Sequence, residues 1–333
     1  METTVIGTAA AAQRAGSGTR WLSANVPSFR RDYNRVSFAI RHTLSTHPLL
    51  ELPRLAKVAE KLRQRGDKDR LVALGARAIE TGTKFTQLQR LEALPDSIRH
   101  LEESGAWMKL SQTNLVDPEY GELADEILQD LEVLSGERLR DEITWPMLTV
   151  FMASPGVVTP YHIDHESNFL MQIRGEKDVC LFDPLDRSVL PEEQIEHFYS
   201  GNAEAARYHD GLVQAGTVYR LVPGVGVHHP PLAPHWVRNG DAVSVSLSFG
   251  FCTRSLDRTA RIYQANLVLR RLGLTPTPPG RSALGDGVKM AAMQLLSKRH
   301  PATRNEMLFS GVRRLAVPVA ALRRLRGNDR RVP

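Results

Sequence analysis

His162 and Asp164 are separated by one residue, and their types and spacing could bind a metal ion. On a β-strand, residues i and i+2 point to the same face, so this imidazole and this carboxylate could reach one ion. A third ligand must come from elsewhere in the chain. His235 is the best candidate, because it follows a turn and a proline-rich approach and leads into a strand-like run. His228 and His229 lie in the same segment and are the alternatives.

Two histidines and one carboxylate on one face of a metal leave three coordination positions open. This donor set is typical of non-haem Fe(II) oxygenases, in which 2-oxoglutarate could take two open positions and O₂ the third. A His-x-Asp pair alone is a common pattern, so the prediction depends on the sequence around it.

Several spaced motifs between about Trp145 and Phe251 resemble those around the iron site of the JmjC and cupin-like 2-oxoglutarate oxygenases. They are TPYHID (159–164), NF (168–169) and QIRGEK (172–177). Within that family, the sequence is most similar to the asparaginyl hydroxylase of hypoxia-inducible factor. The resemblance implies an enzyme that uses Fe(II), 2-oxoglutarate and O₂ to hydroxylate a C–H bond, with release of succinate and CO₂. Removal of an N-methyl group by the same chemistry ranks below hydroxylation.

The resemblance also assigns roles around the metal. It makes His162, Asp164 and His235 the iron ligands, because the distance from Pro223 to the family's last histidine matches His235. The family often has an acid two residues after this proline, where the present chain has Val225.

The same likeness implies a set of co-substrate contacts. Lys177 would pair with the distal carboxylate of 2-oxoglutarate, and Thr159 would hydrogen-bond that carboxylate. Asn168 would lie near the metal-bound end. Ser248 stands where the family commonly has Asn, with a shorter reach, and Lys109 falls near a family tyrosine that contacts the co-substrate.

The elements that must position these residues change in character along the chain. Apolar residues recur at helical spacing in 49–66, 85–105 and 121–136, which predicts helices from about residue 28 to 140. Short runs rich in Val, Ile, Phe and Thr follow, separated by Gly, Pro, Asn and Asp; they are 143–154, 168–175, 177–184, 216–224 and 242–251. Such runs predict an all-β sandwich or barrel.

The predicted fold therefore has a mainly β core with helical flanks: a double-stranded β-helix of the jelly-roll or cupin type, as in JmjC proteins. We expect a flexible tail at 1–25, a helical region at 26–142 that packs on the barrel, a catalytic barrel at 143–253 and a basic helical region at 254–333. The segment 191–216 could shape the substrate mouth.

Composition restricts the class of protein further. Hydrophobic residues make up 42% of the chain and charged residues 24%, as in ordinary globular proteins. The two cysteines, Cys180 and Cys252, lie in apolar runs and are expected to be buried free thiols, which fits a cytoplasmic protein. The sequence contains no apolar stretch long enough to span a membrane and no signal-peptide pattern.

The last 80 residues hold 17 Lys and Arg against 4 Asp and Glu, whereas the whole chain has a net charge of +6. This basic region could bind nucleic acid, although no nucleic-acid-binding motif accompanies it, or form a homodimer through Leu267, Val268, Leu272 and Leu274. The alternative to the oxygenase is therefore a non-catalytic, cupin-like regulatory or nucleic-acid-binding protein. The substrate of an oxygenase would be a protein or peptide side chain or a small metabolite.

Overall fold

The structure is a computed structural model that describes residues 5–6, 19–75, 79–91, 98, 100–301 and 303–325. It divides into two compact units. Unit 1 comprises residues 1–185 and 207–252, and unit 2 comprises residues 186–206 and 253–333. Most of the tail predicted for residues 1–25 lies outside the described residues.

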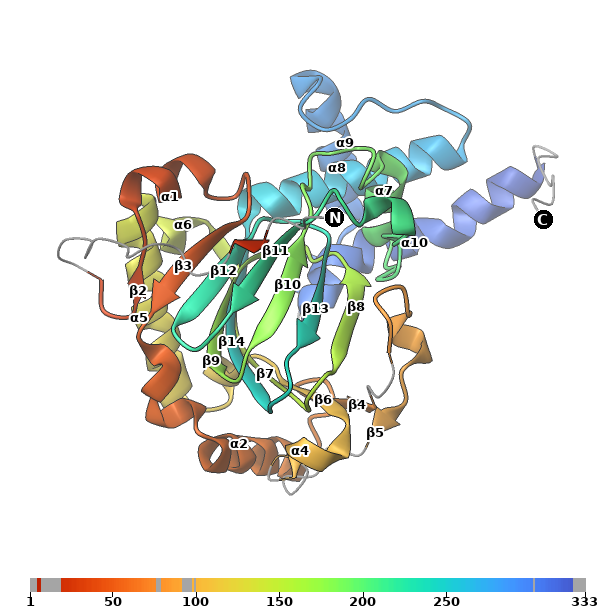
Figure 1. Ribbon diagram of the computed structural model, residues 1–333. Coiled ribbons are helices and arrows are strands. Elements are labelled where there is room, and N and C mark those ends of the chain that lie inside the picture. The colour runs from red at the N-terminus through yellow and green to blue at the C-terminus, as the bar shows by residue number, and fades with distance from the viewer. Residues whose placement is uncertain are drawn as a thin grey trace. The chain divides into compact units, whose positions relative to one another are not determined.

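Unit 1 is built on two β-sheets, with strand orders β1-β11-β10-β13-β8 and β2-β3-β12-β9-β14-β7-β6-β4-β5 (Figure 1). The strands of the smaller sheet are β1 (Val5–Ile6), β8 (Val158–His162), β10 (Lys177–Leu181), β11 (Thr217–Leu221) and β13 (His235–Asn239). Those of the larger sheet are β2 (Leu22–Ser23), β3 (Phe38–His42), β4 (Leu71–Gly75), β5 (Arg90–Leu91), β6 (Ala106–Leu110), β7 (Ile143–Ala153), β9 (Ser167–Arg174), β12 (Val225–His229) and β14 (Ser244–Thr253).

From β7 onwards the chain passes back and forth between the sheets, except that β10 and β11 lie in the same sheet. The strands β8, β10, β11 and β13 belong to the smaller sheet, and β7, β9, β12 and β14 to the larger. Within the sheets, the neighbours β8, β13, β10 and β11 pair antiparallel, as do β3, β12, β9 and β14. This is the double-stranded β-helix that the sequence predicts.

Helices accompany the sheets in unit 1 and make up most of unit 2. Those of unit 1 are α1 (Val26–Asp32), α2 (Leu52–Gln64), α4 (Leu101–Ser104), α5 (Pro118–Ser135) and α6 (Leu139–Glu142). Those of unit 2 are α7 (Glu192–Phe198), α8 (Arg254–Arg271), α9 (Ala283–Leu296) and α10 (Arg304–Leu325). Short 3₁₀ turns occur at Leu44–Thr46, Pro48–Leu50, Phe85–Gln87, Thr113–Leu115 and Asp210–Leu212.

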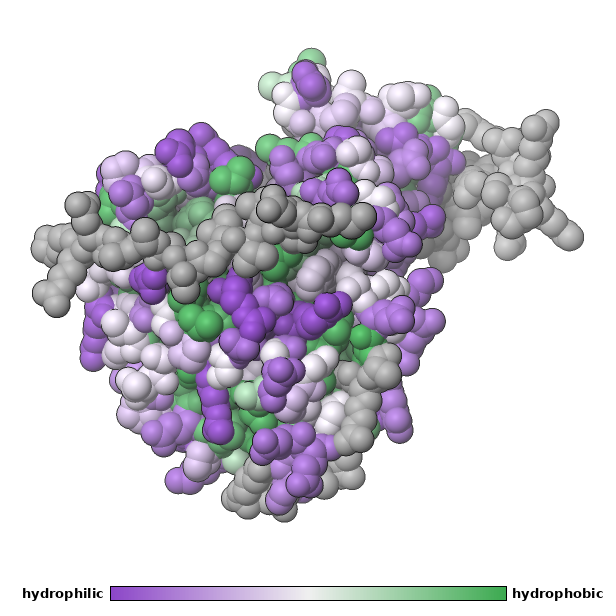
Figure 2. All heavy atoms as spheres, viewed as in Figure 1, coloured by the Kyte–Doolittle hydropathy of each residue, from purple (hydrophilic) through white to green (hydrophobic). Residues whose placement is uncertain are grey.

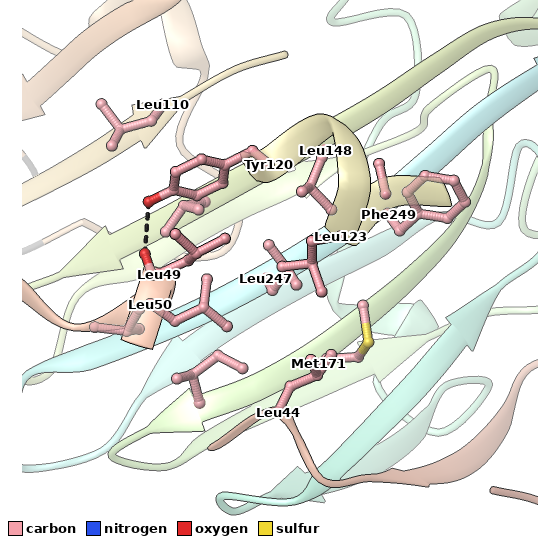
Figure 3. Packing of buried hydrophobic residues seen from close by; sticks show 14 of the residues in the cluster. Leu44, Leu49, Leu50, Leu110, Tyr120, Leu123, Leu148, Met171, Leu247 and Phe249 are labelled. Atoms are coloured by element: carbon pink, nitrogen blue, oxygen red, sulfur yellow. Dashed lines mark hydrogen bonds between the residues drawn. The ribbon is translucent and has the colours of Figure 1, made fainter. Parts of the chain in front are cut away.

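The two faces of the larger sheet have different partners. Alternate residues of β9 and β14, such as Met171, Leu247 and Phe249, join the main hydrophobic core, in which Leu44 and Leu123 also lie (Figure 3). The same core includes leucines of α2 and α5. In the same core, the Tyr120 hydroxyl of α5 donates to the Leu49 carbonyl at 2.5 Å. The opposite face of the sheet turns towards the smaller sheet and includes Leu170, which packs with the apolar residues of β10, β11 and β13.

The region predicted to be helical, residues 26–142, also contributes strands to the larger sheet. β3 pairs with β12, and β6 joins β4 to β7. These strands have only five residues each, and helical spacing in the neighbouring segments does not predict them. The N-terminal region therefore extends the sheet as well as covering it.

One carboxylate of α5 binds the backbone of residues 20–22, at the start of β2. Asp130 is 2% exposed and accepts backbone N–H bonds from Arg20 at 2.7 Å, Trp21 at 2.6 Å and Leu22 at 2.8 Å. We expect Asp130→Ala to lower the free energy of unfolding by roughly 3 kcal/mol, because buried N–H donors lose a charged acceptor. Urea denaturation measures this change. Asp125→Ala on the same helix is the control, since its side chain is 79% exposed, and an equal loss there would contradict this account.

Unit 2 joins α7 to the C-terminal helices. The Arg270 guanidinium of α8 donates to both carboxylate oxygens of Glu196 in α7, at 2.8 and 2.9 Å. The segment 191–216 therefore contributes a helix to unit 2 through its first part. Leu267 is only 2% exposed in this chain and so is not available to a second copy, contrary to the predicted dimer surface, whereas Leu274 is 55% exposed.

Two further expectations concern the cysteines and the membrane. Cys180 and Cys252 are buried and do not form a disulfide with each other, as predicted. No helix in the described part of the chain is long and apolar enough to cross a bilayer. On the face drawn in Figure 2, hydrophilic and hydrophobic residues are interspersed.

Candidate metal centre

Strands β8 and β13 bring the three predicted ligands together. His162 is the last residue of β8 and lies directly opposite His235, the first residue of β13. Asp164 comes two residues after His162, just beyond the end of β8. The Asp164 Oδ2 atom is 3.6 Å from His162 Nε2 and 3.8 Å from His235 Nε2, and the two imidazole centroids are 4.1 Å apart. Ligand atoms about 2.1 Å from one ion and at right angles to each other are about 3 Å apart, so small side-chain rotations suffice for a shared ion.

The hydrogen bonds of both histidines favour metal binding. His162 Nδ1 donates to the Pro160 carbonyl at 2.7 Å, and His235 Nδ1 donates to the Ala233 carbonyl at 3.0 Å. A carbonyl can only accept, so Nδ1 of each ring carries a proton, and Nε2 is the ring nitrogen on the side of Asp164. Burial, and secondly the nearby His162, lower the pKa of His235 well below its ordinary value. Two imidazoles and a carboxylate are a donor set that suits a ferrous ion.

The site is closed on one side and open on the other. The side chain of His235 is 6% exposed, that of His162 18% and that of Asp164 41%. Phe85 packs edge-on against the His162 ring, with centroids 5.2 Å apart. A substrate would therefore approach from the side of the carboxylate.

Lys177 lies on the interior face of β10. It shares this face with Val179 and Leu181, and Leu181 is the register partner of His235. Lys177 is 4% exposed, and burial lowers the pKa of its ammonium group to about 7. Among the described residues, no carboxylate lies within 4 Å of this ammonium. A buried cation without a counter-ion is a suitable partner for an anionic ligand.

Burial of Lys177 has a consequence for the pH dependence of folding. The folded pKa of about 7 is below the ordinary lysine pKa of 10.5, so between these pH values the unfolded chain binds more protons than the folded chain. We expect wild-type stability to rise with pH between about 7 and 9, relative to Lys177→Met, by about 1 kcal/mol per pH unit. Urea denaturation of both proteins at several pH values measures this. A constant difference over that window would show that Lys177 is not buried as described.

The structure places the other predicted contacts on the two facing sheets. Thr159 is 9% exposed and lies opposite Val237, beyond an irregularity in the pairing of β8 with β13. The Ser248 hydroxyl of β14 donates to Asn168 Oδ1 of β9 at 2.7 Å. Lys109 of β6 lies opposite Phe151 of β7.

The alternative third ligands have different positions. His228 faces the outer side of the larger sheet, where its ring stacks on Phe169 with centroids 4.5 Å apart. His229 faces the inner side, where its ring lies 4.7 Å from that of His235. The His228 side chain therefore points away from the candidate metal centre. The His229 side chain lies beside that centre, and the sequence suggests no role for it other than that of an alternative ligand.

The sequence analysis also did not predict that the serines of β14 would be buried. Ser244 and Ser246 are fully buried, and both hydrogen-bond to Gln172 of β9, at 2.9 and 2.6 Å. The alternation of Ser with apolar residues in SVSLSF was a usable signal, since one face of a strand had to be polar.

Comparison with known protein families places most of the chain in one of them. Residues 45–265 match the family model described as the cupin-like domain, which covers more than half of the chain. The protein therefore belongs to the cupin-like domain family.

Lysine-specific demethylase 8 of Danio rerio is a relative, 34% identical over 184 residues. These residues are 51% of this chain and 44% of that protein, so the chain matches less than half the length of this curated relative. The matches do not single out the asparaginyl hydroxylase.

Two solved structures of the Escherichia coli ribosomal oxygenase YcfD are also similar. The complex with cobalt and 2-oxoglutarate is 16% identical, with a TM-score of 0.46, and the match covers 93% of this chain and 68% of that one. A second structure is 13% identical, with a TM-score of 0.44 and coverages of 85% and 74%.

Proposed function

We propose that the protein is an Fe(II)- and 2-oxoglutarate-dependent oxygenase, with His162, Asp164 and His235 as the iron ligands. The observation that carries the proposal is the convergence of two Nε2 atoms and one carboxylate, together with a buried lysine, Lys177, on the interior face of the neighbouring strand β10. A ferrous ion held by these residues would supply oxidation of a substrate C–H bond by O₂, coupled to conversion of 2-oxoglutarate to succinate and CO₂.

The residues of the barrel would bind and orient the co-substrate. The Lys177 ammonium would pair with the distal carboxylate of 2-oxoglutarate, and Thr159 would hydrogen-bond the same group. Binding of this anion would raise the pKa of Lys177 from about 7 and so keep the ammonium charged. Asn168 and Ser248, already bonded to each other, would lie near the metal-bound end. Lys109 is a further proposed contact.

The difference in exposure between Lys177 and Asp164 supports separate positions for the co-substrate and the substrate. Lys177 is enclosed, so the co-substrate would occupy the interior, where it is shielded from water. Asp164 is the most exposed of the three ligands, so the substrate would reach the metal on that side.

The substrate class is a second part of the proposal. A protein or peptide side chain is favoured by the relative whose name describes lysine demethylation, and that match covers 51% of this chain. A small metabolite is the alternative substrate. Hydroxylation and removal of an N-methyl group begin with the same C–H oxidation, so the same residues would serve both reactions. We rank hydroxylation first, because the sequence motifs resemble those of a hydroxylase.

Formation of labelled succinate from 2-oxoglutarate tests the proposal. We expect conversion that requires Fe(II) and O₂ and that increases when a pool of peptides contains the substrate. Equal conversion without iron would contradict the proposal. Salt-dependent DNA binding by a protein that does not bind 2-oxoglutarate would favour the non-catalytic alternative, in which the basic C-terminal region is the binding element.

A further inference from the structure

Two adjacent histidines at the end of β12 have opposite environments. His228 uses both ring nitrogens: Nε2 accepts from the Asn34 N–H at 3.1 Å, and Nδ1 donates to the Asn168 carbonyl at 3.1 Å. His229 is 4% exposed, and among the described residues neither of its ring nitrogens has a hydrogen-bond partner. His228 is thus satisfied within the fold, whereas His229 lacks two partners.

The position of His229 indicates where those partners would come from. Strand alternation turns its side chain to the inner face of the larger sheet. Its ring lies 4.7 Å from that of His235, at an interplanar angle of 78°, and its backbone pairs with Asn168 of β9. Buried polar groups in native proteins nearly always have partners, so an unpartnered ring beside a metal centre indicates a bound ligand.

The hydrogen bond of Ser248 explains why a bound ligand would need another hydrogen-bond donor on this face of the sheet. Its only hydroxyl proton goes to Asn168 Oδ1 at 2.7 Å, so it is not available to a bound ligand. The Asn168 amide nitrogen and the His229 ring remain as donors on this inner face. An imidazole carries at least one N–H in either protonation state.

We propose that the His229 ring donates a hydrogen bond to the metal-bound end of 2-oxoglutarate, and so supplies the donor that Ser248 does not. This inference rests on the proposed function. His229 is a positioning residue, since it would hold a carboxylate oxygen of the co-substrate without binding the metal. A substrate is a less suitable partner, because His229 is as enclosed as Lys177, whereas the substrate would approach on the exposed side of Asp164.

Calorimetric titration of Mn(II)-loaded protein with 2-oxoglutarate tests the proposal without turnover. We expect His229→Leu to weaken binding about tenfold, which is the loss of one charge-assisted hydrogen bond. We expect His229→Gln, which retains an N–H, to bind within about threefold of the wild type. The affinity for Mn(II) should change less than twofold in both variants, and the Tm of His229→Leu should not fall.

The matched control is His228→Leu, the same substitution one residue earlier on the opposite face. It removes two satisfied hydrogen bonds, so we expect a lower Tm and a 2-oxoglutarate affinity within twofold of the wild type. Because the two variants should differ in both measurements, a general effect of altering β12 is separated from a contact with the ligand.

Each contrary result has a definite meaning. Wild-type binding of 2-oxoglutarate with unchanged affinity in His229→Leu would overturn this inference and leave the proposed function standing. Loss of Mn(II) binding in His229→Leu would make His229 a metal ligand and would also overturn it. A His229→Gln protein no better than His229→Leu would reduce the ring to a packing role. Absence of Mn(II)-dependent 2-oxoglutarate binding in the wild type would overturn the inference and the proposed function together.

Discussion

Replacing Asp164 by asparagine is expected to weaken Fe(II) binding by roughly a hundredfold or more and to abolish 2-oxoglutarate-dependent succinate formation. The substitution preserves shape and removes the only negative charge among the three ligands, while both Nε2 atoms keep their positions 3.6 and 3.8 Å from the former carboxylate. Loss of one partner of a close charge pair costs several kcal/mol, which corresponds to a factor of a hundred or more. Metal titration and the succinate assay measure the two effects.

Asp178→Asn is the control for this experiment. Asp178 lies on β10 but is partly exposed and pairs with Arg220 at 3.1 Å, an interaction worth at most about 1 kcal/mol at a surface. We expect wild-type metal affinity and turnover in this variant. If Asp164→Asn retained wild-type iron affinity, the assignment of this carboxylate as a ligand would be wrong.

Lys177→Met should have opposite effects on function and on stability. Loss of the ammonium should weaken 2-oxoglutarate binding about a hundredfold, because the distal carboxylate would then be buried without a cation. At pH 7 the same change should raise the free energy of unfolding by about 1–3 kcal/mol, because an uncompensated charge leaves the interior. Calorimetric titration and urea denaturation measure these quantities.

Lys57→Met provides the same substitution at an exposed position of α2. Both quantities should stay near their wild-type values in this variant, with a stability change within about 0.5 kcal/mol. A Lys177→Met protein that binds 2-oxoglutarate normally would exclude Lys177 from the co-substrate site. One that is less stable than the wild type would show that the ammonium has a partner in the free protein.

The sequence predicted the strand that begins with Lys177. It did not predict the two short strands that carry metal ligands, β8 and β13, because none of the expected strand runs covers them. His162 and Asp164 are two residues apart, and Lys177 begins a strand that β-rich composition and a glycine turn mark clearly. The double-stranded β-helix itself was inferred from the resemblance, which covers several motifs. Pairing across sheets is non-local and cannot be read from spacing alone.

Residues whose role depends on distant partners could not be predicted. In β14 the serines would conventionally face solvent, yet Ser244 and Ser246 are fully buried, because helices α2 and α5 cover the apolar face and leave the polar face for the barrel interior. The short strands β3 and β6 are defined by their neighbours in the sheet rather than by local sequence. His229 differs from His228 only in the strand face it occupies, and the sequence does not give the register that decides this.

Diffraction from crystals grown anaerobically with Fe(II) and 2-oxoglutarate tests the central claim most directly. We expect an anomalous iron peak about 2.1 Å from His162 Nε2, His235 Nε2 and an Asp164 carboxylate oxygen, with 2-oxoglutarate extending towards Lys177. An iron peak at other residues, or a His235 ring turned away from the metal, would contradict it.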